Sequence, residues 1–93
     1  MEKDEHYFYV VSCKDESLYA GYTNDLERRI RLHNEGKGAK YTRGRGPVRL
    51  VFTKKYPTKS EALKAEYAFK QLKRKEKVQY IREQGQYVAA EEL

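Results

Sequence analysis

The spacing of apolar residues changes along the chain, and these changes predict six elements. Residues 7–13 are aromatic and β-branched, which favours a strand. After four polar residues a second apolar run covers residues 18–22, and so short a connection predicts an antiparallel hairpin. Residues 48–56 alternate through Val48, Leu50 and Phe52, which predicts a third strand with one face buried.

Helical spacing follows the second and third strands. Leu26, Ile30 and His33 mark one face of a first helix, which we expect Asn24 to cap and the glycines at 36 and 38 to end. A second helix is predicted after the capping box of residues 58–61, on an apolar stripe formed by Ala62, Ala65, Phe69 and Leu72. Residues 75–84 favour a short third helix.

The resulting order ββαβαα predicts an α+β fold, a three-stranded antiparallel sheet with flanking helices. With 93 residues, the chain is expected to form a single domain over residues 1–93. Its core is expected in about residues 6–82, with residues 83–93 as a C-terminal tail.

Positive charge is concentrated in one stretch. The net charge is +6, and residues 36–60 contain eight Lys or Arg and no acidic residue. A continuous basic segment favours a polyanion as partner, and we expect nucleic acid, DNA in the first place. The alternative is a solvated basic loop and strand. The expected contacts to nucleic acid come from Lys37, Lys40, Tyr41, Arg43, Arg45 and Arg49.

The single cysteine and the absence of long apolar runs indicate a reducing compartment. Cys13 can form neither an internal disulfide nor a cysteine-based zinc cluster, and in an apolar strand we expect a buried thiol. No stretch approaches the roughly 20 apolar residues that cross a bilayer. We therefore expect a cytoplasmic protein, with or without association to the nucleoid, that has no membrane partner. The sequence leaves its oligomeric state open between a monomer and a weak dimer.

Two charged residues border apolar helix faces, where burying a charged side chain without a partner is unfavourable. Arg29 shares a face with His33, and burying an arginine there is costly unless it meets a carboxylate or a phosphate. Glu66 can hold a divalent ion whose other ligands are water and phosphate. The alternatives are a snorkelling surface arginine and an ordinary Glu66–Lys70 pair one helical turn apart.

The remaining candidates also have structural alternatives. His33 could transfer a proton near neutral pH or bind phosphate, or it could be a partly buried helix histidine. Tyr9 and Tyr19 could be catalytic phenols or aromatic core residues of two strands.

Together these residues resemble the GIY-YIG nuclease family. Tyr9 lies ten positions before Tyr19-Ala20-Gly21, Arg29 follows eight positions after Gly21, and Glu66 lies on a later helix. The resemblance covers about residues 6–82 and is strongest to small stand-alone bacterial members. The first motif reads Tyr-Phe-Tyr in place of Gly-Ile-Tyr, and Ala20 replaces an isoleucine, but both motif tyrosines are retained.

The resemblance implies a role for each of these residues. Tyr9, Tyr19, Arg29 and His33 would be catalytic, with Arg29 stabilising charge on the phosphate and one tyrosine activating water. Glu66 would bind one Mg²⁺ or Mn²⁺ ion. Gly21 would be the motif glycine that allows close approach of the backbone.

We therefore expect a metal-dependent DNA endonuclease of low sequence specificity. The alternative is a non-catalytic nucleic-acid-binding module that retains the GIY-YIG fold. Several family members carry an asparagine beyond the glutamate, whereas none follows Asn34 here, and Gln71 and Gln79 are the candidate amides in its place.

Overall fold

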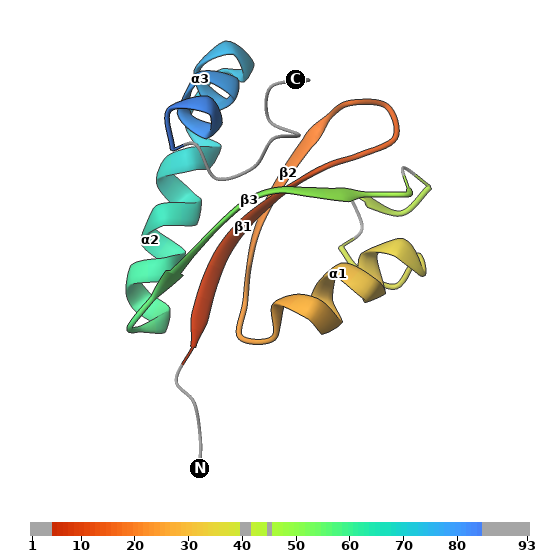
Figure 1. Ribbon diagram of the computed structural model, residues 1–93, viewed down its shortest axis with the longest axis horizontal. Coiled ribbons are helices and arrows are strands. Elements are labelled where there is room, and N and C mark those ends of the chain that lie inside the picture. The colour runs from red at the N-terminus through yellow and green to blue at the C-terminus, as the bar shows by residue number, and fades with distance from the viewer. Residues whose placement is uncertain (1–4, 40–41, 45, 85–93) are drawn as a thin grey trace.

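The computed structural model describes residues 5–39, 42–44 and 46–84, and within them it confirms the predicted order of elements. The strands and helices are β1 (His6–Ser12), β2 (Leu18–Thr23), α1 (Leu26–Asn34), β3 (Arg49–Tyr56), α2 (Lys59–Lys70) and α3 (Arg74–Gln84). The strands form one antiparallel sheet in the order β2-β1-β3, so β1 is the central strand (Figure 1). The predicted tail lies outside the described residues from residue 85 onward.

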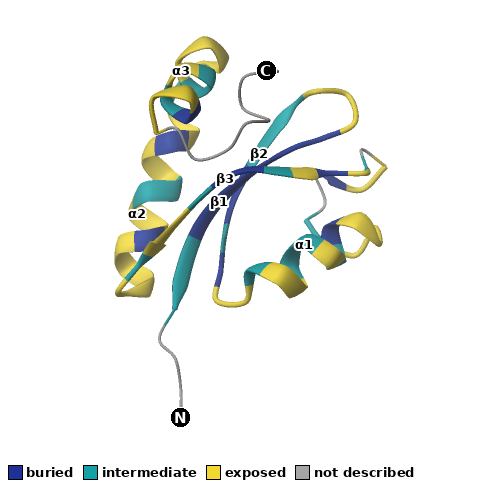
Figure 2. Ribbon diagram, viewed as in Figure 1, coloured by how far each residue is buried: buried dark blue, intermediate teal, exposed yellow. Residues whose placement is uncertain are grey.

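Helices cover both faces of the sheet, α1 on one side and α2 with α3 on the other (Figure 1). One apolar cluster, which contains Phe52 and Phe69, lies beneath α2 and α3. The second contains Tyr9 and Val11 and lies beneath α1. Because β1 contributes to both clusters, residues 8–13 are all buried, and Figure 2 shows the resulting dark band through the middle of the sheet.

A β-bulge between β1 and β3 corrects the predicted strand pattern. Val10 pairs with Phe52 whereas Val11 pairs with Leu50, so Val51 is an extra residue on β3. Val51 and Phe52 both join the cluster beneath α2, while Leu50 packs against the cluster beneath α1. The prediction that Leu50 and Phe52 share one face is therefore wrong, because one extra residue moves the following side chain to the opposite face.

The first helix begins one residue later than predicted. Asp25, not Asn24, is the N-cap, and its Oδ1 accepts the backbone N–H of Arg28 at 3.3 Å. Thr23 Oγ1 accepts the N–H of Asp25 at 3.0 Å, which holds the chain in a turn immediately before the cap. The predicted cap of α2 at Thr58 is confirmed.

A side chain at the end of α1 holds the two ends of the following loop together. As predicted, α1 stops before Gly36, and its last residue, Asn34, accepts the N–H of Val48 at 2.7 Å. Cys13 is buried, also as predicted. Among the described helices, none is long and apolar enough to cross a membrane.

Two substitutions on α2 test which of its faces packs on the sheet. Phe69 is buried against the rings of Phe8 and Tyr80, so we expect Phe69→Ala to lower the free energy of unfolding by about 3–5 kcal/mol. Tyr67 is 68% exposed, and alanine favours helix, so Tyr67→Ala should change it by no more than about 0.5 kcal/mol. Chemical denaturation measures both, and equal losses would contradict the packing described.

Candidate active site

The hairpin and α1 bring four of the predicted site residues together. Tyr9 pairs with Gly21 across the hairpin, and Tyr19 lies two residues before Gly21, so both phenols leave the same face of the sheet. This is the face that α1 covers with Arg29 and His33. The ring of His33 lies edge-on to both tyrosine rings, with centroids 5.8 Å from Tyr9 and 5.5 Å from Tyr19.

Buried hydrogen bonds connect His33 to the loop that follows α1. His33 Nδ1 lies 2.8 Å from Thr42 Oγ1, which in turn lies 3.0 Å from the carbonyl oxygen of Ala39. A carbonyl can only accept, so the single hydroxyl hydrogen of Thr42 is donated to Ala39. Thr42 Oγ1 must then accept from His33, and Nδ1 carries the hydrogen of the neutral imidazole.

This tautomer sets the direction of the hydrogen bond to Tyr9. His33 Nε2 is the acceptor, and the Tyr9 hydroxyl donates to it at 2.8 Å. The Tyr9 oxygen in turn accepts from Arg29 Nε–H at 3.4 Å, a long contact for a hydrogen bond. One directed chain thus runs from Arg29 through Tyr9 and His33 to Thr42.

The burial of this chain fixes its protonation. The side chains of Tyr9, His33 and Thr42 belong to residues that are each 1% exposed. Burial raises the pKa of Tyr9 to about 12, against the opposing effect of Arg29. Burial, aided by the charge of Arg29, lowers the pKa of His33. At neutral pH Tyr9 is therefore a protonated phenol and His33 a neutral imidazole.

Two glycines make room for the rings. A Cβ at Gly21 would lie 2.6 Å from the hydroxyl oxygen of Tyr9, and one at Gly38 would overlap Nδ1 of His33. Neither position accepts a side chain unless a buried ring moves. The close backbone approach expected at Gly21 is therefore an approach to Tyr9. Gly38 and Thr42 were missed from the sequence, because a basic, glycine-rich loop carries no sign of which residue turns inward.

Arg29 is half-buried between the two phenols. Its hydrogen bond to Tyr9 raises the pKa of Arg29, as does a hydrogen bond to Tyr19. Both partners are hydroxyl groups and not carboxylates, so they orient the guanidinium without forming an ion pair with it. A positive group held in this way suits an anionic ligand such as a phosphate.

Glu66 reaches the same region from α2. Its Oε2 pairs with Lys70 Nζ at 2.7 Å, and this ammonium lies 5.8 Å from the centroid of the Tyr19 ring. The charge of Glu66 is also felt at Tyr9, where it adds to the larger effect of burial in raising the pKa. The ordinary Glu66–Lys70 pair has therefore formed, and it lies beside the candidate site.

The donors near Glu66 limit the kind of metal that could bind. In the described part of the chain, no three His, Cys, Asp or Glu side chains gather into a metal-binding group. A single carboxylate fits an ion that takes its other ligands from water and substrate phosphate, as Mg²⁺ does. The ammonium of Lys70 lies 2.7 Å from Oε2 of Glu66, so a metal ion bound to that oxygen would have to displace it.

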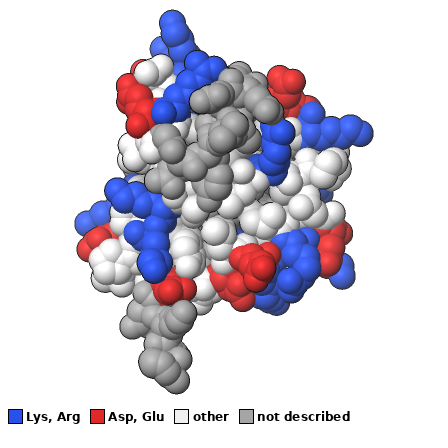
Figure 3. All heavy atoms as spheres, in the orientation of Figure 1, with Lys and Arg blue, Asp and Glu red and all other residues white. Residues whose placement is uncertain are grey.

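The predicted nucleic-acid contacts are described in part. Lys37, Arg43 and Arg49 are exposed, the first two on the loop that Thr42 anchors. Lys40, Tyr41 and Arg45 lie outside the described residues. On the face shown in Figure 3, basic side chains gather over α1 and on the side where α2 lies, with acidic groups beside them.

The motif, the fold and the clustered side chains define a GIY-YIG domain. The chain belongs to this family, since the model of the GIY-YIG catalytic domain matches residues 5–79. Its relatives are UPF0213 proteins. One from Bacillus velezensis is 63% identical over 83 residues, covering 89% of this chain and 84% of that protein. The UPF0213 protein YazA of Bacillus subtilis is 60% identical with the same coverage of both chains.

Solved structures agree with the fold. The solution NMR structure of a UPF0213 protein from Bacillus halodurans is 51% identical and superposes with a TM-score of 0.61. A protein from E. faecalis, also solved by NMR, is 51% identical with a TM-score of 0.63. Each comparison covers 92% of both chains. The resemblance read from the tyrosine, arginine and glutamate spacing is confirmed at the level of family and fold.

Removing the Thr42 hydroxyl tests the direction of the buried chain. Thr42→Val keeps the shape but leaves His33 Nδ1–H without its acceptor, so the free energy of unfolding should fall by about 1–3 kcal/mol. The ¹⁵N spectrum of His33 should lose its pure Nδ1–H signature in this variant, whereas Thr42→Ser should retain it. An Nε2–H tautomer in the wild-type protein would contradict the assigned direction.

Protonation of His33 predicts how stability depends on pH. The pKa of His33 is lowered in the folded state, so the unfolded chain, with a histidine pKa of about 6.5, binds the proton first as pH falls. The free energy of unfolding should therefore decrease as pH falls from about 7.5 through the unfolded-state pKa of about 6.5, by up to about 1.4 kcal/mol per pH unit. Denaturant titrations at several pH values measure the free energy of unfolding of wild type and of His33→Gln. If this free energy depends on pH equally in both proteins, His33 is excluded as the cause.

Proposed function

We propose that the protein is a metal-dependent endonuclease that hydrolyses DNA phosphodiester bonds with little sequence preference. The observation that carries this proposal is Arg29, half-buried and oriented by two phenols, with Glu66 paired to the Lys70 ammonium that lies 5.8 Å from the ring of the second phenol. Membership of a family defined by a catalytic domain supports it.

Each side chain of the site receives a distinct task. Arg29 stabilises the negative charge that grows on the phosphate during attack by water. With a pKa of about 12 and its hydrogen donated to His33, Tyr9 is not a general base at neutral pH, and it serves to hold Arg29. His33, buried and bonded at both ring nitrogens, is a positioning residue for Tyr9. Tyr19, the more accessible phenol, contacts the attacking water.

Glu66 is the residue that would hold a single Mg²⁺ or Mn²⁺ ion. When bound, such an ion supplies Lewis-acid stabilisation to the leaving oxygen. Lys70 would release the carboxylate to such an ion, and substrate phosphate would provide the ligands that the described residues near Glu66 do not supply.

Basic residues in and after the loop that follows α1 bind the substrate. Lys37, Arg43 and Arg49 are exposed, and we assign them to backbone phosphates and not to base edges. Lys40, Tyr41 and Arg45 belong to the same basic segment of the sequence, and we assign them the same kind of contact. Such contacts predict weak sequence preference and an affinity that falls steeply with salt. They do not require more than one copy of the chain, consistent with a monomer or weak dimer.

Nicking of supercoiled plasmid, with Mg²⁺ and Mn²⁺ tried separately, tests the proposal. Arg29→Ala and Glu66→Gln should each reduce the rate by at least about 100-fold, because each removes a group that stabilises charge in the transition state. DNA binding, measured in the presence of a chelator, should be retained. Arg31→Ala is the matched control, since Arg31 is an exposed arginine on the same helix.

The outcomes separate the two candidate functions. If wild-type protein binds DNA but nicks no substrate with either ion, the function is that of a non-catalytic nucleic-acid-binding module. If Arg29→Ala nicks DNA at the wild-type rate, the role assigned to Arg29 in the mechanism is wrong.

A further inference from the structure

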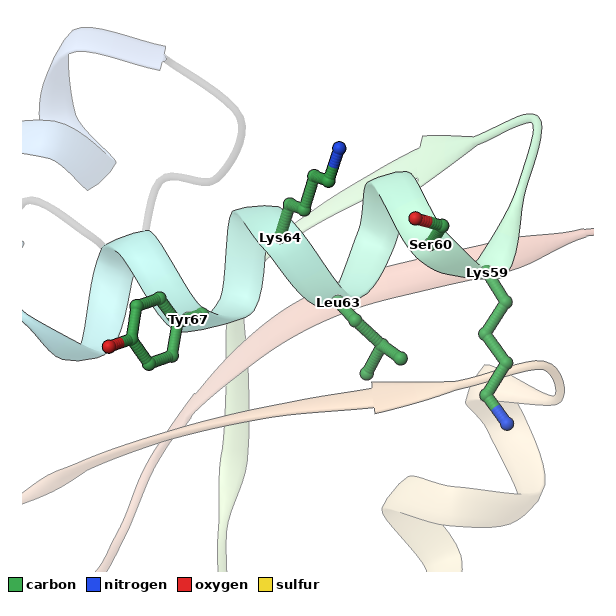
Figure 4. A pocket seen from close by; sticks show the side chains of 5 residues that line it. All are labelled: Lys59, Ser60, Leu63, Lys64 and Tyr67. Atoms are coloured by element: carbon green, nitrogen blue, oxygen red, sulfur yellow. The ribbon is translucent and has the colours of Figure 1, made fainter.

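An exposed apolar pair interrupts the charged outer surface of α2. Leu63 and Tyr67 are 40% and 68% exposed, and they are the exposed large hydrophobic residues of the described chain. Lys59, Ser60 and Lys64 complete the lining of the shallow depression around them. Figure 4 shows Lys59, Leu63 and Tyr67 projecting to the same side of the helix. Below, the α2 platform denotes Lys59, Leu63, Lys64 and Tyr67.

The spacing of the platform places it directly beside the candidate site. Lys59, Leu63 and Tyr67 are four residues apart and form one row along α2. Leu63 lies three residues before Glu66, and Tyr67 lies three before Lys70, so each neighbours one member of the Glu66–Lys70 pair on the helix surface.

The same row follows the edge strand β2. Lys59 Nζ lies 5.6 Å from the centroid of the Tyr22 ring, and Lys70 Nζ lies 5.8 Å from that of Tyr19. Lys59 also lines a hollow with Arg28 and Arg29 at the end of β2. A strand of nucleic acid whose phosphate lies at Arg29 therefore reaches the platform along Lys59. Asp25 lines the same hollow, and the carboxylate of Glu66 beside the platform is paired with Lys70.

We propose that the α2 platform binds a nucleotide adjacent to the scissile phosphate, with its base stacked on Tyr67 and against Leu63. Lys59 and Lys64 contact the flanking phosphates. The inference rests on the proposed function and narrows its substrate class. A base can stack on a protein ring only after leaving its neighbours, so the preferred substrates contain unpaired or displaced bases near the cut.

The chemistry of the platform favours nucleic acid over a protein partner. An aromatic ring between lysines is the combination that binds unpaired nucleotides, because every base has a stacking face and every nucleotide a phosphate. A stable protein interface needs about 800 Å² on each partner. One leucine and one tyrosine among lysines provide only a small part of that area, and interface cores are depleted in lysine.

Fluorescence anisotropy with a labelled single strand and the blunt duplex of the same sequence, both in EDTA, tests the platform without cleavage. Tyr67→Ala should weaken single-strand binding by about 5- to 150-fold, the range for loss of one stacked base, and leave duplex binding within about twofold. Tyr67→Phe should bind like wild type. Circular dichroism checks that both variants are folded.

The lysines are tested by salt dependence. Lys64→Gln should reduce the slope of log affinity against log salt by about 0.7 on the single strand, the value for one lost phosphate contact. Lys75→Gln, an exposed lysine on α3, is the matched control and should leave the slope unchanged.

The results distinguish this inference from the proposed function. If wild type nicks DNA and Tyr67→Ala binds both substrates like wild type, the inference about the platform is wrong. The proposed nuclease function is then unaffected. Single-strand binding that depends on Tyr67 in a protein that never cleaves would support the platform and overturn the nuclease. A change in sedimentation of Tyr67→Ala without a change in DNA binding would assign the face to self-association and overturn the platform.

Discussion

The hydrogen bond from the Tyr9 hydroxyl to His33 Nε2 joins the central strand to α1, and the geometry of the site depends on it. His33 is the only residue of α1 that is fully buried, whereas Leu26 and Ile30 are partly buried. Apolar contacts with the sheet therefore stabilise the position of α1 less than they stabilise that of α2. Because a buried polar group that loses its partner costs about 1–3 kcal/mol, the bond fixes where α1 lies on the sheet. Arg29, one turn earlier on the helix, is positioned by the same bond.

A polar chain in so small a core is tolerable only when every member is satisfied. Among the described residues, no buried side-chain nitrogen or oxygen lacks a hydrogen-bond partner. The chain ends at the carbonyl of Ala39, and Thr42 is its last side chain. Both residues belong to the loop that carries Lys37 and Arg43. The surface that would hold DNA and the phenol that holds Arg29 are thus connected through two hydrogen bonds.

Local rules explain why much of the fold and the site could be predicted. Strand and helix order follow from apolar spacing, and the ten-residue interval from Tyr9 to Tyr19 spans a hairpin that returns both phenols to one face. The errors arise where a choice depends on tertiary contacts. The bulge at Val51 has no glycine or other mark in the sequence. Thr42 could not be found because its partner, His33, lies nine residues away across an irregular loop.

The position of the site at the edge of the sheet follows from the layer arrangement. Since α1 and α2 cover opposite faces, side chains from the two helices can meet only around an edge strand, and β2 is that strand. Tyr19 lies on it and contacts both helices, with His33 of α1 at its ring edge and Lys70 of α2 over its face. An arginine from one layer and a carboxylate from the other can therefore approach each other only at this edge.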